Sequence, residues 1–99
     1  MSTAPALTVA PDHPALAGHF PGMPVVPGVV LLDHALHAIG LAIGADLSAC
    51  RIGSLKFQSP VLPGQTVDVL HECGDGGTIR FNLMHGARKV AAGVLHLPA

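Results

Sequence analysis

The chain has 99 residues, of which 49% are hydrophobic and only 11% are charged, and its formal net charge is −1. This length fits one small domain, residues 1–99, and leaves no room for a second. The five Lys and Arg residues are scattered, which argues against a nucleic-acid partner, because binding to phosphates requires a basic surface. Since few polar side chains can cover the surface, we expect an exposed apolar patch and a homo-oligomer.

Targeting and membrane signals are weak. The first ten residues have no basic region ahead of an apolar run, as a signal peptide would. The apolar stretch from Val29 to Gly44 is interrupted by Asp33, His34 and His37, which disfavours a membrane span. Two distant cysteines without zinc-ligand spacing predict reduced thiols in a cytoplasmic protein.

The first third of the chain predicts little regular structure. We expect a short strand over residues 6–10 and an irregular segment from residue 11 to residue 26, where four prolines interrupt hydrogen bonding. A helix is predicted from Gly28 to about Gly44, with Pro27 at its start, where a missing N–H costs nothing.

After the helix, apolar and polar residues alternate with the period of strands. Leu55 and Phe57 share one face of the first run, and Gly53 predicts a bulge. The expected strands cover residues 52–58, 67–72, 79–84 and 89–97. The sequence therefore predicts an α+β fold, in which a curved antiparallel meander of four or five strands wraps one central helix. Such a sheet has a free edge that a second copy could complete.

The groups able to do chemistry lie around the start of the helix. His19 is in the Pro-rich segment, Gly28 is in the first helical turn, and Asp33 is about one and a half turns further. The first N–H groups of a helix have no intrahelical acceptor and can bind a negative oxygen. A carboxyl in an apolar helix is unfavourable unless it is paired or protonated. His19 and Asp33 are distant in sequence, so only tertiary or quaternary structure can bring them together.

Two segments carry a family resemblance. Residues 18–29, GHFPGMPVVPGV, with Asp33 after them, resemble the signature of the β-hydroxyacyl-acyl-carrier-protein dehydratases, which have the hot-dog fold. Residues 55–65, LKFQSPVLPGQ, resemble the family's next strand and turn. The resemblance implies a hydro-lyase that forms trans-2-enoyl thioesters in fatty-acid or polyene lipid synthesis. It also implies a phosphopantetheine-bound substrate on an acyl carrier protein, no metal or redox cofactor, and active sites at a homodimer interface, with a higher oligomer also open.

The resemblance assigns roles residue by residue. His19 aligns with the base that removes the α proton, and the Gly28 N–H with the donor that polarises the thioester carbonyl. Asp33 aligns with the acid that helps the β-hydroxyl leave, and in the family it meets the histidine of the other subunit. Phe20, Pro27 and Val29 are expected to border the acyl chain.

Other residues allow two interpretations. His37 replaces a common glutamine and can reach Asp33 one turn away, so it is either a partner of Asp33 at the substrate site or a core histidine. Arg88 and Lys89 are candidates for contact with an acidic carrier protein, or a simple turn pair. His34 projects about 100° away from Asp33, so no metal site is predicted. The remaining histidines, at positions 13, 71, 85 and 96, are expected at the surface or on edge strands.

Two alternative functions stay open. A hot-dog acyl thioesterase would use the carboxylate to activate water against the thioester. A non-catalytic partner subunit would keep the fold without turnover.

Overall fold

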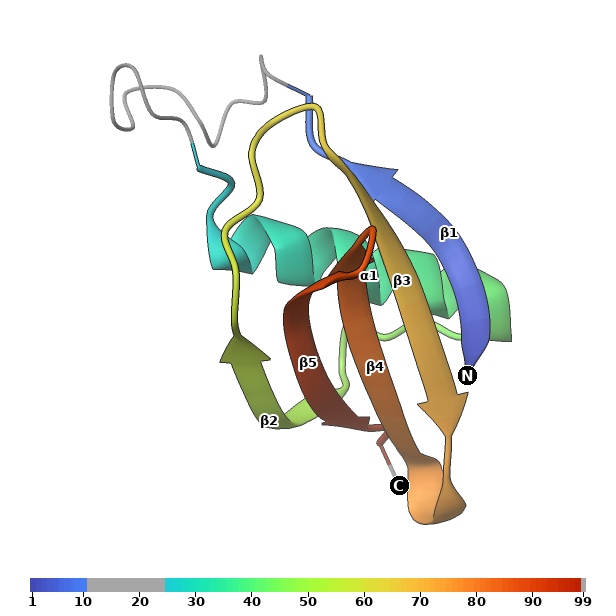
Figure 1. Cartoon of the computed structure of the whole chain (residues 1–99). Helices are drawn as coiled ribbons and strands as arrows, with labels where there is room; N and C mark the ends of the chain where they lie inside the picture. Colours follow the sequence, from blue (N-terminus) through green and yellow to red (C-terminus); the bar gives the residue numbers. More distant parts are fainter. Residues whose placement is uncertain (11–24, 99) are drawn as a thin grey trace.

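The computed structural model describes residues 1–10 and 25–98. Within these residues, one 16-residue helix, α1 (Gly28–Ile43), lies across one face of a five-stranded antiparallel sheet (Figure 1). The strands are β1 (Ser2–Thr8), β2 (Arg51–Phe57), β3 (Thr66–Cys73), β4 (Thr78–His85) and β5 (Arg88–His96), and a short 3-10 turn, η2 (Asp75–Gly77), joins β3 to β4. This is the hot-dog arrangement that the resemblance implies.

The strand order is β1-β3-β4-β5-β2. The predicted meander is correct for β3, β4 and β5, which tight turns connect, but wrong for β2. This strand lies at the far edge beside β5, and residues 58–65 carry the chain back to β3. A tight turn forces neighbouring strands to pair, whereas a longer connection does not. The predicted bulge in β2 is confirmed by a register shift between Ile52 and Ser54.

The helix begins and ends where the sequence predicts. Pro27 is extended, with φ −58° and ψ 141°, and Gly44 closes the helix in the left-handed conformation at φ 71°, which glycine adopts without strain. One side of α1 is buried against the sheet. The opposite side is open, because Val29 is 73% exposed and Leu41 is 63% exposed. This side of the helix carries the exposed polar residues Asp33 and His37 as well as these two apolar ones.

His71 contradicts its predicted surface position, because only 5% of it is exposed. It alternates in step with Val67 and Val69 on β3, so it faces the helix with them. Within residues 1–10 and 25–98, neither ring nitrogen has a hydrogen-bond partner. Strand alternation, applied without regard to residue type, would have predicted this burial.

In the described part of the chain, no helix combines the length and apolar character needed to cross a bilayer.

Candidate active site

The N-terminus of α1 presents unengaged backbone donors. The N–H groups of Val30 and Leu31 both donate to the Pro27 carbonyl, at 3.0 Å and 3.2 Å. Among the described residues, the N–H groups of Gly28 and Val29 have no backbone acceptor. No side chain of the described residues caps this end, and the first turn contains no acidic residue. The positive end of the helix dipole is therefore available to a negative oxygen from outside the helix.

A hollow of about 410 Å³ surrounds Gly28. Its lining comes from the helix start and from the segment that follows β2: Val25, Val26, Gly28, Leu31, Phe57, Gln58, Ser59, Pro60 and Val61. A hydrogen bond of 2.8 Å from the Val26 N–H to the Val61 carbonyl ties these segments together. The tertiary structure thus joins the ends of the two sequence motifs in one mostly apolar pocket.

Sequence reasoning placed Phe57 only on a strand face, yet this residue borders the hollow at Gly28. The signal that could have found it was present, because Phe57 belongs to the second motif and alternates toward the helix side. Pro27 stands between Val26 and Gly28 in the chain but does not line the hollow. Val29 is turned outward and does not line it.

Asp33 and His37 line a different hollow, of about 380 Å³, between α1 and residues 5–8 of β1. Both side chains are exposed, so His37 is not a core histidine in this chain. The expected apolar burial of Asp33 is not present in the single chain, because position 33 lies on the side of α1 that faces away from the sheet. Gly28 and Asp33 therefore do not share one cavity within a single chain.

His19 and Phe20 lie outside the described residues, as does His13. Their predicted roles stay predictions.

Arg88 and Lys89 are exposed at the start of β5. The carbonyl of the next residue, Val90, accepts hydrogen bonds from the N–H groups of Gln58 and Ser59, at 2.8 Å and 3.2 Å. Gln58 and Ser59 line the Gly28 hollow. The basic pair is therefore held beside the chain segment that borders this hollow.

Other histidines and the cysteines lie outside both hollows. His85 Nδ1 lies 2.8 Å from the Thr66 carbonyl oxygen, and His96 Nδ1 lies 3.4 Å from Thr78 Oγ1. Cys50 and Cys73 are free thiols. In residues 1–10 and 25–98, no three His, Cys, Asp or Glu side chains gather in a group that could hold a metal ion.

Comparison with known sequences identifies dehydratases among the relatives of this chain. The family model described as ApeI-like, ApeI dehydratase, matches residues 2–94. The 3-hydroxyacyl-(acyl-carrier-protein) dehydratase FabZ of Chlamydia trachomatis serovar L2 is 33% identical over 97 residues, covering 85% of this chain and 63% of the relative. FabZ of Mannheimia succiniciproducens is 32% identical over 72 residues, covering 65% and 48%. The chain thus spans less than two thirds of the length of these relatives.

Solved structures share the fold. The dehydratase heterocomplex ApeI:P from Xenorhabdus doucetiae contains a chain with a TM-score of 0.74 and 24% identity, covering 95% of this chain and 84% of that one. An uncharacterized protein from Erwinia carotovora subsp. atroseptica has a TM-score of 0.65 and 31% identity, covering 94% and 79%. A mutant of the fluoroacetyl-CoA-specific thioesterase FlK has a TM-score of 0.67 and 18% identity, covering 96% and 84%.

The likenesses below 25% identity establish the hot-dog fold alone, because thioesterases and dehydratases both use it. The family model is more specific and spans nearly all of the sequence. The chain therefore belongs to the ApeI-like family of hot-dog dehydratases.

Proposed function

We propose that this chain dehydrates β-hydroxyacyl thioesters to trans-2-enoyl thioesters. The observation that carries the proposal is the apolar hollow at Gly28, which the unengaged N–H groups of the helix start border. A thioester carbonyl bound there would find a donor for the negative charge that develops on its oxygen. Membership of a dehydratase family supports the same reaction.

The first half of the reaction breaks the α C–H bond. His19 takes the proton, and the electron pair moves toward the thioester oxygen, which the Gly28 N–H stabilises. A positioned general base contributes about 10²–10⁴-fold and one oxyanion donor about 10²–10³-fold. Because an α proton beside a thioester is very weakly acidic, neither group suffices alone.

The second half breaks the β C–O bond. Asp33 donates a proton to the departing hydroxyl, water leaves, and the electron pair forms the double bond between the α and β carbons. No electrons are gained or lost overall, so the proposed reaction needs no redox cofactor. A carboxyl acts as an acid best when it is removed from water. Asp33 is exposed in the single chain, so the proposal requires a second copy to cover it.

The two edge strands of the sheet indicate how a second copy would bind. β1 contains Pro5 and a register shift between Ala4 and Leu7, and both features oppose pairing with another strand. β2 pairs regularly with β5 from Ser54 to Phe57 and contains no proline. We therefore place the homodimer contact at β2, whose last residue borders the Gly28 hollow. In this dimer, Asp33 of one copy would serve the histidine of the other.

The substrate is proposed to arrive on the phosphopantetheine arm of an acyl carrier protein, as the names of the FabZ relatives suggest. Arg88 and Lys89 would then attract the acidic carrier protein. The pathway would be the synthesis of fatty acids or of polyene lipids in the cytoplasm.

The test is turnover of crotonyl and 3-hydroxybutyryl thioesters, on carrier protein and on coenzyme A, by the purified chain. We expect interconversion by the wild type and a loss of about 10²–10⁴-fold in both His19→Ala and Asp33→Asn, as for the removal of a general base or acid. Asp46→Asn changes an exposed carboxylate outside the site and should behave as the wild type. No interconversion at any chain length, with His19→Ala behaving identically, would show that the proposal is wrong.

A thioesterase is the second candidate, because Asp33 is an accessible carboxylate beside a hollow and could activate water. Release of free thiol that depends on Asp33 but not on His19 would favour it. Absence of either activity, together with tight binding to a separate active dehydratase chain, would indicate a non-catalytic subunit.

A further inference from the structure

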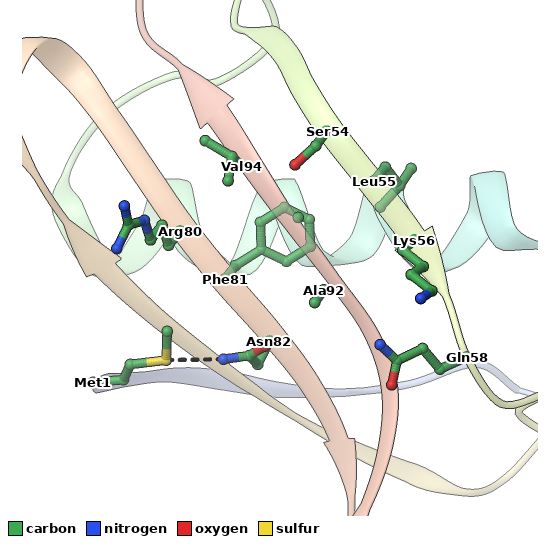
Figure 2. Close-up of a pocket in the computed structure, with 11 residues that line it drawn as sticks. Met1, Ser54, Leu55, Lys56, Gln58, Arg80, Phe81, Asn82, Ala92 and Val94 are labelled. Atoms are coloured by element: carbon green, nitrogen blue, oxygen red, sulfur yellow. Dashed lines mark hydrogen bonds between the residues drawn. The ribbon is translucent and has the colours of Figure 1, made fainter.

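The face of the sheet that is turned away from α1, called the outer face, carries a groove along β5 (Figure 2). The short side chains of Ala92 and Val94 form its floor. Polar side chains beside this strand form its walls: Arg80 and Asn82 on β4, Ser54 and Lys56 on β2, and Gln58 just after β2. Met1 also lines the groove, and its sulfur accepts a hydrogen bond from the Asn82 amide at 3.1 Å. This β5 groove has a volume of about 430 Å³.

The charged residues of the β5 groove are all cationic. Lys56 and Arg80 are exposed, and no acidic residue among those described lines the groove. Lys56 lies opposite Ala92 of β5, whereas Arg80 lies opposite Glu72 of β3 and lines a second hollow together with Glu72 and Asp75. An apolar floor beside cationic groups is complementary to a surface with an apolar centre and acidic flanks.

The outer face itself presents such a surface on β3. Asp68, Leu70 and Glu72, called the acidic ridge, point to this face because successive residues of a strand alternate. The residues between and beside them are buried on the helix side: Val67, Val69 and His71. Both acids are exposed and Leu70 is half-buried.

The register of the sheet places the acidic ridge and the β5 groove at the same position along the strand direction, here called height. Three cross-strand rows join them through β4: Leu70 to Ala92, Asp68 to Lys89, and Glu72 to Val94. β3 and β5 are the two neighbours of β4, about 4.8 Å away on either side. The ridge and the groove therefore lie on opposite sides of β4, at equal distances from it.

We propose that the outer face binds a second copy of this chain, with the acidic ridge of each copy in the β5 groove of the other. A two-fold axis above β4 and parallel to the strands exchanges β3 with β5 and preserves the height of every row. Leu70 of one copy then lies over Ala92 of the other, and Asp68 lies over Lys89, which adjoins the β5 groove, each twice. The same axis brings Arg80 of the two copies together, and each Arg80 has Glu72 as its neighbour on β3. Of the basic pair, Arg88 stays available to a carrier protein.

This contact involves the central strands, where two outward-curved sheets approach each other most closely. Face-to-face sheets pack about 10 Å apart, a distance that side chains of this size fill. The contact leaves the β2 edge free, so it would join two edge-paired dimers as readily as two single chains. It does not depend on the enzymatic activity proposed above.

An exchange of two charges tests the proposal. Asp68→Lys and Lys89→Asp each place like charges together at both symmetric contacts, whereas the double variant restores opposite charges between copies. Within one chain these residues are two strands apart, so their own interaction changes little. We expect each single variant to weaken association at least about tenfold and the double variant to return close to the wild type. Sedimentation velocity and light scattering over a range of concentrations measure the association.

Two further variants complete the experiment. Asp46→Lys makes the same change of charge at an exposed residue in the connection between α1 and β2, which lines neither the ridge nor the groove, and should associate as the wild type does. Leu70→Ser removes the apolar centre of the ridge and should weaken association without changing the charge. The charge variants alter exposed residues, so unchanged circular dichroism should confirm that they fold.

Three results would overturn the proposal. The single variants could keep the mass of the wild type, or the double variant could fail to recover. Alternatively, Lys56→Glu could abolish binding of an acidic carrier protein while the mass stays that of the wild type. That last result would make the β5 groove the docking site of an acidic protein instead.

Discussion

The ring of Phe57 lies against the backbone of Gly28, so that a β-carbon added at position 28 would come within 2.7 Å of the ring Cζ atom. This contact joins the end of β2 to the start of α1. It explains the glycine sterically, because any side chain there would displace the ring. It also sets one wall of the hollow in which the helix donors lie.

Gly28→Ala should therefore destabilise the fold. The ring of Phe57 is 45% exposed and can move, so we expect a loss of about 1 kcal/mol, the lower end of the range for overpacking. Urea unfolding measures this loss. Adding Phe57→Leu should restore much of the stability of Gly28→Ala, because a smaller side chain makes room. A double variant no more stable than Gly28→Ala would contradict the steric explanation.

Gly93→Ala should be more damaging than Gly28→Ala. Its β-carbon would lie 2.6 Å from the ring of Phe81, which is only 1% exposed, and 2.8 Å from the backbone oxygen of Ser54. Neither group can move freely, so we expect a loss of about 3 kcal/mol or more in the free energy of unfolding. Gly74→Ala is the matched control, because its nearest neighbour would be 3.8 Å away. Equal losses in Gly93→Ala and Gly74→Ala would refute this expectation.

Replacing His71 with leucine should stabilise the protein. Burial removes both ring nitrogens of His71 from water, and the part of the chain that the structure describes provides no hydrogen-bond partner for them. Such an arrangement costs about 1–3 kcal/mol. His71→Leu keeps a side chain of similar size and removes that cost, so the melting temperature should rise. His71→Gln keeps a buried polar group and should give no gain. A lower melting temperature for His71→Leu would mean that the imidazole has a partner in the assembled protein.

Asp46 should make a small pH-dependent contribution to stability. The Ser48 backbone N–H donates to Asp46 Oδ1 at 2.9 Å, and this bond, followed by one from the Ser48 hydroxyl, lowers the pKa of Asp46 below its ordinary value of 3.8. A lowered folded-state pKa stabilises the fold above the unfolded value and loses that effect as the pH falls.

The difference in stability between the wild type and Asp46→Ala should thus be constant above about pH 5. It should shrink as the pH falls below 3.8, the ordinary value for this carboxyl. Urea unfolding between about pH 3 and pH 7 measures it. A difference that grows toward low pH would have the wrong sign for this hydrogen bond.

The sequence by itself determined the helix, its two ends and the period of the strands after it. These features depend on local causes: Pro27 and Gly44 suit their backbone conformations, and alternation of apolar residues determines which face of a strand is buried. The sequence also determined the family, because the two motifs consist of residues at fixed offsets. The alternation of β3 would also have predicted that His71 is buried. We expected it at the surface because its side chain is polar.

Only the tertiary structure decided what no local pattern encodes. It placed β2 at the sheet edge, because the connection after β2 is long enough to allow more than one partner strand. It brought Phe57 onto Gly28 and left Asp33 in another hollow, because the two positions lie on different sides of one helix. The sequence thus supplied the chemical groups, and the packing of the helix on the sheet decided which of them one chain can bring together.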